Sequence, residues 1–365
     1  MRVKLEDVCE RGTSSLMQKD IVDKNGKYPV YGASGRIGSM ETYQQEHQTV
    51  AVVKDGAGIG RTMLLPEKSS IIGTMQYLIP KNCIEPEYLY YVVKYMHLEK
   101  YFSGATIPHI YFRDYKTEEF NLHDKTEQRE IVSTLKRIEA IISNRQEQLT
   151  RLDELIKARF VEMFGDPKLN PCRFPCNSLS TYITFLTSGS RGWSQYFTDS
   201  GEYFITIKNV KNCKITLQDV QYVTPPDNAE AKRTKVQKND LLISITADLG
   251  RTGVVTEEIA NHGAYINQHL TCIRLKDEQV NPLYVAYYME SDAGKEQFTA
   301  KNQSAVKAGL NFNAINSLKL MVPPLSLQNQ FATFVEEVDK SKVEVQKALD
   351  QTQLLFDSLM QQYFG

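Results

Sequence analysis

Two long stretches of the chain share a seven-residue repeat of apolar positions. Residues 127–164 and 327–364 both carry this repeat, and each stretch ends in phenylalanine with glycine directly after it. The repeated positions, separated by four and three residues in turn, are Ile131, Leu135, Ile138, Ile142, Arg145, Leu149, Leu152, Ile156, Arg159 and Met163 in the first stretch, and Phe331, Val335, Val338, Lys342, Val345, Leu349, Thr352, Phe356, Leu359 and Tyr363 in the second. A heptad repeat sustained over five heptads predicts two helices that pack along one apolar seam.

The helices are expected to be long and to have marked ends. Each stretch lacks glycine and proline before its final glycine, so it can run about 38 residues, or about 57 Å. Asp124 or Thr126 can cap the first helix, and Ser326 follows two prolines before the second. Polar residues on the seam have two interpretations. They either fix register and partner, or they lie at the rim with charged heads in water.

The connectivity predicts how the helices are paired. Residues 166–322 must leave the end of the first helix and enter the start of the second, and short connections favour an antiparallel pair. We therefore expect an α+β protein with a pseudo-twofold internal repeat, in which two similar α/β domains lie at opposite ends of a long antiparallel two-helix coiled coil. The expected divisions are residues 1–122, 123–165, 166–322 and 323–365.

Short apolar runs in the two remaining segments predict strands, with one amphipathic helix near the end of each segment. Expected strands cover residues 49–53, 62–66 and 71–72 in the first segment and 202–210, 240–246 and 253–256 in the second. Expected helices cover 86–102 and 282–298, each with proline in its first turn. Sequence landmarks recur in order: Gly60-Arg61 with Gly250-Arg251, Gln76 with Gln268, Pro86 with Pro282 and Ile110 with Leu310. The two segments are therefore expected to share one scaffold.

Composition excludes several classes of protein. The chain has 365 residues, 41% of them apolar, and a net charge of −1, so no overall basic field indicates nucleic acid. Local loops can still bind DNA. The six cysteines and six histidines show no metal-ligand spacing, and we expect Cys172 and Cys176 to be free thiols. No signal peptide or membrane-spanning stretch is expected, which favours the cytoplasm.

Glycine-containing loops carry the candidate chemistry. Residues 55–61 have the spacing G-x-G-x-G and precede a strand, so we reject a dinucleotide-binding interpretation, which needs a helix there. Residues 28–38 form a glycine turn with Ser34 and Arg36, either a plain strand connection or a loop that contacts a duplex groove. Trp193 is expected to pack inside its domain, and residues 232–235 to form a solvated face.

Polar residues in these loops, in the equivalent segments near 103–113 and 301–311, in the loop 188–196 around Trp193, and at positions 208, 209 and 251 are the candidate DNA contacts. They are Ser34, Arg36, Arg61, Thr106, His109, Tyr111, Arg113, Ser190, Arg191, Lys208, Asn209, Arg251, Ser304, Lys307 and Asn311. Guanidinium, carboxamide and hydroxyl groups are suited to base edges and phosphates. No catalytic residue and no metal ligand is expected.

The chain resembles the DNA-specificity subunits of type I restriction–modification enzymes. The resemblance is carried by residues 28–35 (YPVYGASG), 55–61 (DGAGIGR), 238–244 (KNDLLIS) and 323–328 (PPLSLQ), and by the two Phe-Gly helix ends. It covers essentially the whole chain through the order and duplication of these motifs. The first copy departs from the family's Pro-Pro-Leu helix lead, with Asn121, Leu122 and His123 in its place.

The resemblance implies a non-catalytic subunit that reads a bipartite target in double-stranded DNA, with the helices as ruler and docking surface. It implies two methyltransferase subunits and, in the restricting complex, motor-nuclease subunits as partners. S-adenosylmethionine, ATP and magnesium are then expected on those partners and none on this chain. The chain itself has neither an amino-methyltransferase motif nor a nucleotide phosphate loop.

Two alternatives remain open at this point. One is the recognition subunit of a related bifunctional restriction–methylation enzyme. The other is a coiled-coil scaffold whose globular ends bind protein. A stand-alone enzyme is disfavoured because the sequence shows no Ser/His/Asp, metal or nucleotide constellation.

Overall fold

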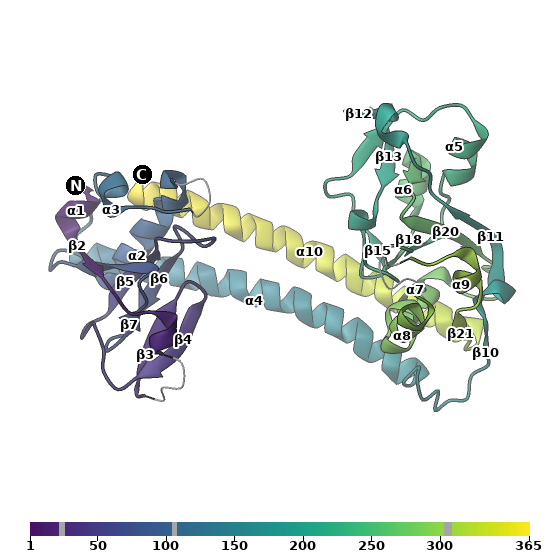
Figure 1. Cartoon of the computed structure of the whole chain (residues 1–365), viewed down its shortest axis with the longest axis horizontal. Coiled ribbons are helices and arrows are strands. Elements are labelled where there is room, and N and C mark those ends of the chain that lie inside the picture. Colours follow the sequence, from purple (N-terminus) through teal and green to yellow (C-terminus); the bar gives the residue numbers. More distant parts are fainter. Residues whose placement is uncertain (22–25, 104–107, 303–308) are drawn as a thin grey trace. The chain divides into compact units, whose positions relative to one another are not determined.

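The structure is a computed structural model that describes residues 1–21, 26–103, 108–302 and 309–365. The chain divides into two compact units. Unit 1 comprises residues 1–148 and 345–365, and unit 2 comprises residues 149–344. Each unit contains one mixed sheet-and-helix domain together with part of each long helix (Figure 1).

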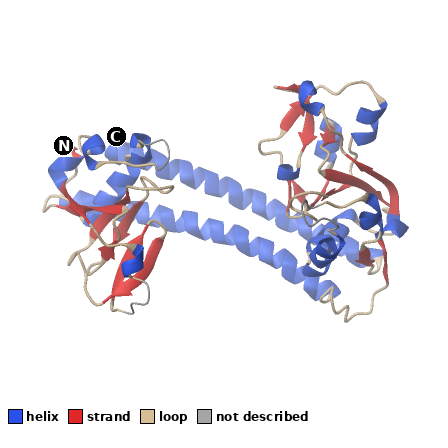
Figure 2. Ribbon diagram, in the orientation of Figure 1, coloured by secondary structure: helices blue, strands red, loops and turns tan. Residues whose placement is uncertain are grey.

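The described residues of unit 1 form three small sheets (Figure 2). The four-stranded antiparallel sheet has the order β2 (Cys9–Thr13), β8 (Met75–Pro80), β5 (Thr49–Val53) and β6 (Thr62–Leu65). The three-stranded sheet has the order β4 (Gly35–Met40), β3 (Tyr28–Gly32) and β7 (Ser70–Ile71), with β3 parallel to β7. Strands β1 (Arg2–Lys4) and β9 (Glu119–Asn121) form an antiparallel pair. The short helices are α1 (Leu5–Val8), α3 (Phe112–Tyr115) and the 3-10 turns η1 (Gln18–Asp20) and η2 (Leu98–Tyr101).

Helix α2 (Pro86–Tyr95) joins the four-stranded sheet of unit 1 to the long helices. Its apolar residues share one core with strands β5 and β8 and with residues of both long helices. Phe364 packs edge-on against Tyr88 of α2, with ring centroids 5.2 Å apart. The Tyr88 hydroxyl donates to the Asn121 carbonyl at 2.8 Å, which ties α2 to strand β9.

Unit 2 repeats this topology. Its four-stranded antiparallel sheet has the order β11 (Ile183–Ser188), β20 (Leu270–Leu275), β17 (Leu241–Ser244) and β18 (Thr252–Val254). A second sheet has the order β12 (Phe197–Thr198), β16 (Gln221–Val223), β13 (Glu202–Ile205) and β19 (Ala264–Ile266), with β13 parallel to β19. Two antiparallel pairs complete it: β10 (Cys176–Ser178) with β21 (Lys319–Met321), and β14 (Val210–Lys211) with β15 (Lys214–Ile215). The helices are α5 (Ala229–Thr234), α6 (Glu257–His262), α7 (Pro282–Glu290), α8 (Asp292–Lys301) and α9 (Phe312–Asn316), with 3-10 turns η3 (Leu179–Tyr182), η4 (Trp193–Tyr196) and η5 (Ile207–Asn209).

The helix α7 takes the place in unit 2 that α2 has in unit 1. The Tyr284 hydroxyl donates to the Met321 carbonyl at 2.8 Å, and Phe164 packs edge-on against Tyr284 with centroids 4.8 Å apart. The same four-stranded order, the same parallel pair and the same Tyr–Phe contact occur in both units. The expected internal repeat is therefore confirmed.

Each long helix contributes its beginning to one unit and its end to the other. Helix α4 spans Lys125–Phe164 and helix α10 spans Leu325–Phe364. In unit 1, Arg145 of α4 donates to the Ala348 carbonyl and the Thr352 hydroxyl of α10. In unit 2, Lys342 of α10 forms an ion pair with Asp153 of α4. In unit 1, Ile131 and Leu135 of α4 share a core with Phe356 and Phe364 of α10, and in unit 2 Phe160 and Phe164 of α4 pack against Phe331 of α10. Early residues of one helix thus contact late residues of the other, which confirms the antiparallel pairing.

The polar seam positions divide between the two interpretations. Arg145, Thr352 and Lys342 bond across the helix pair, where such contacts favour one register. Arg159 lies at the rim, where its guanidinium is 5.7 Å from the Phe334 ring centroid and pairs with Glu162 of its own helix. Both interpretations therefore apply, at different positions.

The helix starts differ in part from expectation. Asp124 caps α4, because its Oδ1 accepts hydrogen bonds from the N–H groups of Thr126 and Glu127 at 2.8 and 2.9 Å. The Asp124 N–H in turn donates to the Glu127 carboxylate at 3.2 Å. Ser326 does not precede α10 but lies in its first turn, since the helix begins at Leu325.

Several other expectations about the elements were wrong. The strand expected over residues 202–210 is interrupted by the 3-10 turn η5 (Ile207–Asn209). The single helix expected over residues 86–102 is broken at His97, which has φ of 50°, and the one over 282–298 is broken at Ser291, which caps α8. Gln76 is not equivalent to Gln268. Met75 pairs with Val53 in unit 1 as Leu270 pairs with Ser244 in unit 2. The residue equivalent to Gln76 in the second copy is therefore Thr271. Among the described residues, no helix combines the length and the apolar character needed to span a bilayer.

Candidate nucleic-acid interface

Two glycine-containing segments meet at one edge of the domain in unit 1. Ser34 and Arg36 are exposed on the β3–β4 hairpin, whose turn is completed by Gly35 at φ of 111°, a backbone conformation that glycine adopts without strain. The Arg61 guanidinium donates to the Ala33 carbonyl at 2.7 Å. Arg61 thus links the loop at residues 54–61 to the hairpin, and Arg36 and Ser34 present their polar groups beside it.

A third segment of unit 1 joins this edge through His109. The Gly56 N–H donates to the Pro108 carbonyl at 3.0 Å, and His109 Nδ1 lies 2.7 Å from Asp55 Oδ1. Partial burial opposes ionisation of Asp55, but hydrogen bonds from Lys54 and His109 outweigh it and lower the pKa of the carboxyl. His109 is consequently held in place and is half-buried.

Tyr111 and Arg113 extend the same edge. The Arg113 guanidinium carbon lies 4.8 Å above the Tyr111 ring centroid, and both side chains are exposed. Arg113 also forms an ion pair with Asp114 at 3.3 Å. A guanidinium stacked on an aromatic ring presents a flat, oriented donor group suited to a phosphate or a base edge.

The equivalent loop of unit 2 covers residues 245–251. Its backbone repeats that of unit 1: Gly250 N–H donates to Ser244 O at 3.0 Å, as Gly60 N–H donates to Val53 O at 2.9 Å. Gly250 has φ of 79°, and a Cβ there would lie 2.2 Å from the Phe298 ring. Arg251 forms an ion pair with Asp248 within this loop, so its charge is partly neutralised.

The other candidates in unit 2 have different environments. Arg191 and Lys208 are exposed, and Ser190 is 8% exposed and accepts a hydrogen bond from Arg233 at 3.4 Å. Asn209 is 2% exposed and bonds internally to Thr206, Thr216 and Gln218. The Asn209 side chain therefore holds the η5 turn together and is not accessible to DNA.

Asn311 caps α9, and its Oδ1 accepts the Ala314 N–H at 2.8 Å. Thr106, Ser304 and Lys307 lie outside the described residues, so their predicted role stays a prediction. Trp193 is 4% exposed and stacks on Phe204 at 5.3 Å, which confirms the expected packing role. The 232–235 stretch is more than a solvated face, since Arg233 bonds to the Ser188 carbonyl at 3.0 Å.

Sequence reasoning missed the turn at Asn267, Gln268 and His269. These residues connect β19 to β20 and lie beside Ser190 and Thr246, two positions of the candidate interface region. The available signal was a run of three polar residues between two apolar strands. Its importance depends on the pairing of Asn267 with Ser190, which is distant in the sequence, and a local pattern cannot show such a pairing.

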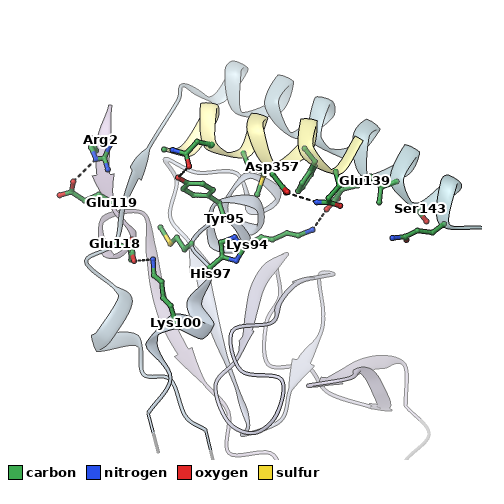
Figure 3. Close-up of a pocket in the computed structure, with 18 residues that line it drawn as sticks. Arg2, Lys94, Tyr95, His97, Lys100, Glu118, Glu119, Glu139, Ser143 and Asp357 are labelled. Atoms are coloured by element: carbon green, nitrogen blue, oxygen red, sulfur yellow. Dashed lines mark hydrogen bonds and ion pairs between the residues drawn. The ribbon is translucent and has the colours of Figure 1, made fainter. Parts of the chain in front are cut away.

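A larger cavity of about 1110 Å³ lies in unit 1 between α2, η2 and the long helices (Figure 3). Its charged side chains pair with one another. Lys94 bonds Glu139 at 2.6 Å, Lys100 bonds Glu118 at 2.5 Å, and Arg2 bonds Glu119 at 3.1 Å. The first pair joins α2 to α4 and the other two lie within the domain. Because these charges are already paired, this cavity is less suited to DNA than the exposed edge.

The fold and the polar edges together define a class: a duplicated recognition protein, in which each of two copies of one domain presents exposed polar side chains on its loops. Comparison with known proteins identifies the family. The model of the type I restriction modification DNA specificity domain matches residues 1–152 and 194–352. The chain therefore belongs to the type I restriction–modification DNA specificity family.

Individual relatives are distant. The chain is 21% identical over 170 residues to the Type I restriction enzyme EcoBI specificity subunit of Escherichia coli, a match covering 45% of this chain and 35% of that protein. The chain thus spans about a third of the length of this curated relative. Its fold is similar to that of the S subunit of the type I restriction–modification system of M. genitalium, with a TM-score of 0.62, 16% identity, and coverage of 100% and 96% of the two chains. A structure from work on complex assembly and conformational transition of the type I R-M system has a TM-score of 0.59, 16% identity, and coverage of 100% and 97%.

Proposed function

We propose that this chain is a sequence-specific DNA-recognition subunit that reads a bipartite target in double-stranded DNA. The observation that carries the proposal is the exposed polar edge present on both copies of one domain, in a chain of the DNA specificity family. Each domain reads one half of the target. The chain has no overall positive charge, so recognition depends on these local edges.

The recognition chemistry follows from the side chains. Arg36, Arg113 and Tyr111 of unit 1, and Arg191 and Lys208 of unit 2, are exposed at the two edges. Arginine forms bidentate bonds with guanine, and lysine and arginine grip phosphates, which sets register on the duplex. Thr106, Ser304 and Lys307 remain proposed contacts on the basis of their place in the sequence.

We further propose that α4 and α10 form the docking surface for two methyltransferase subunits. Leu155 and Leu355 occupy the same position of the repeat, and they are 47% and 51% exposed. An apolar side chain exposed at equivalent places on both helices suits a partner that binds twice. Motor-nuclease subunits join in the restricting complex.

Changing these leucines tests the docking proposal. Leu155→Asp or Leu355→Asp should each reduce binding from two methyltransferase subunits to one, and the double variant should bind none. Lys157→Asp and Asp350→Lys, at exposed polar positions of the same helices, should retain two. Mass photometry or native mass spectrometry counts the subunits. Two subunits bound to the double variant would rule out this surface.

Catalysis and cofactors are proposed to reside on the partners. S-adenosylmethionine would bind the methyltransferase subunits, and ATP and magnesium the motor-nuclease subunits. The sequence supports this by its lack of methyltransferase and phosphate-loop motifs. The proposal places the chain in the cytoplasm, where the DNA target lies.

The length of the long helices is proposed to set the spacing of the two half-sequences. Each helix has 40 residues, or about 60 Å at 1.5 Å per residue. This length corresponds to at most about 18 base pairs at roughly 3.4 Å per pair.

Mapping methylated bases in the host genome tests the function and the spacing together. Cells with the chain and its methyltransferase subunit should show methylation at two short sequences separated by one fixed spacer. Deleting only the gene for this chain should abolish that methylation. Methylation that persists after the deletion would contradict the function, and a variable spacer would contradict the role of helix length.

A further inference from the structure

The turn between β19 and β20 is a rigid polar ridge in unit 2, formed by Asn267, Gln268 and His269. Its backbone is held on both sides, because Asn267 N–H donates to Ile205 O and Leu270 N–H donates to Asn267 O, each at 3.1 Å. Gly189 packs directly against it, and a Cβ at residue 189 would lie 2.1 Å from the Asn267 carbonyl oxygen. The ridge is therefore preorganised, as base-reading groups need to be.

The side chains of the ridge form one hydrogen-bond network. Asn267 Oδ1 accepts the His269 N–H at 3.1 Å, and the Gln268 carboxamide nitrogen lies 3.2 Å from His269 Nε2. His269 Nδ1 lies 2.7 Å from Thr246 Oγ1, so the imidazole is held at both of its nitrogens. This network orients the Asn267 carboxamide, whose Nδ2 has no partner within the part of the chain that the structure describes.

The ridge separates two hollows, and each hollow contains one exposed cation. A hollow of about 270 Å³ is lined by Arg191, Trp193 and Phe204 together with the ridge. A second, of about 610 Å³, is lined by Lys208 and Gln218 and again by Asn267 and His269. Neither Arg191 nor Lys208 forms an ion pair with any described residue. A polar ridge flanked by two unpaired cations matches a DNA groove flanked by two phosphate backbones.

We infer that the 267–269 ridge is the base-reading element of the domain in unit 2, that Asn267 pairs with an adenine in the major groove, and that Arg191 and Lys208 contact the phosphates on its two sides. This inference rests on the proposed DNA-recognition function and specifies how one domain performs it. We assign adenine because of the hydrogen bonds that a carboxamide can form. Nδ2 can donate to adenine N7 while the second lone pair of Oδ1 accepts from N6–H, a pairing that no other base offers in the major groove.

Replacing Asn267 by Asp provides a direct test. The carboxylate can still accept the His269 N–H, so the ridge keeps its backbone, but it can no longer donate to N7 and is instead suited to the cytosine N4 amino group. The purified full-length chain is incubated with randomised DNA duplexes, and the bound fraction is sequenced. Wild type should enrich a bipartite motif. Asn267→Asp should change one position of one half from adenine to cytosine, with a change in preference on the order of tenfold or more, and leave the other half unaltered.

Gln218→Glu is the matched control, since it makes the same amide-to-carboxylate change at an exposed position of the neighbouring hollow. It should leave the motif unchanged. Arg191→Gln and Lys208→Gln should weaken binding to all sequences alike and should each reduce the slope of log affinity against log salt by about 1.

The outcomes separate the inference from the function on which it rests. If wild type enriches no motif, the DNA-recognition function itself fails. If wild type enriches a bipartite motif and Asn267→Asp leaves every position unchanged, the function stands and the ridge is not the reader. If Arg191→Gln or Lys208→Gln alters the motif without changing the salt dependence, the assignment of these residues to phosphates is wrong.

Discussion

The two domains each bond an imidazole to equivalent residues of the repeat, but by different chemistry. In unit 1, His109 is bonded to the carboxylate of Asp55, and in unit 2, His269 is bonded to the hydroxyl of Thr246. Asp55 and Thr246 are equivalent, since the residues before them, Lys54 and Ile245, form matching bonds with Ile110 and Leu310. The histidines, however, come from different segments of the fold. The scaffold is therefore shared at the level of backbone bonds, while the polar surface on it is assembled separately in each copy.

The helix-end phenylalanines give the largest expected effect. Phe364→Ala should destabilise the domain of unit 1, and Phe164→Ala the domain of unit 2, by about 3–5 kcal/mol each, because both rings are fully buried. Hydrogen exchange with mass spectrometry should show faster exchange in β5 and β8 for the first variant and in β17 and β20 for the second. The Phe→Leu variants should show the same pattern more weakly. If both Ala variants affected the same domain, the equivalence of the two helix ends would be wrong.

The buried glutamines at the helix starts should give an intermediate effect. Gln128 accepts the Glu85 N–H and donates to the Cys83 and His123 carbonyls, whereas Gln328 accepts the Asn281 N–H and donates to the Pro323 carbonyl. Each Gln→Ala change should cost about 1–3 kcal/mol, with Gln128 the more costly because it makes one more bond. Chemical denaturation followed by circular dichroism measures the loss, and Gln148→Ala, at an exposed position, serves as the control. If Gln128→Ala lost no more stability than Gln328→Ala, the number of hydrogen bonds would not explain the relative stability of the two helix starts.

The acid dependence of the two loops should give the smallest effect. The pKa of Asp55 is lowered in the fold, so its contribution to stability is present above the unfolded pKa of about 3.9 and is lost as pH falls through the lower folded value. The expected loss is below about 1 kcal/mol, because the carboxylate is partly exposed. Exchange rates in residues 54–61 should rise between about pH 4 and pH 2 after correction for intrinsic exchange, and Asp55→Asn should remove the rise. The equivalent Thr246 carries no titrating group, so a similar rise in residues 245–251 would have another cause.

The long helices could be predicted from the sequence because the heptad seam is a local, repeated signal. Their ends were predicted to within two residues, since Phe-Gly closes both and Gly165 has φ of 76°. The break at His97 could not be foreseen, because a left-handed histidine is uncommon and depends on its surroundings. Ser291 followed by Asp292 did carry a helix-start signal, which the apolar periodicity of the stretch obscured.

The candidate site was harder to predict because exposure is decided by non-local contacts. Asn209 has the chemistry of a base reader, but residues 206, 216 and 218 enclose it. Asn267 was overlooked for the opposite reason. Its half-buried amide becomes significant only when the fold brings residues 190, 208 and 246 around it.

The buried contact between Phe364 and Tyr88 has a consequence for how the protein is made. The domain of unit 1 is synthesised first but lacks this ring until about 240 further residues have been translated, which takes on the order of ten to fifty seconds. The domain of unit 2 has its own ring, Phe164, before its first strand leaves the ribosome. The domain translated first is therefore the one completed last, and the nascent chain carries an unfilled apolar site in its first domain through most of its synthesis.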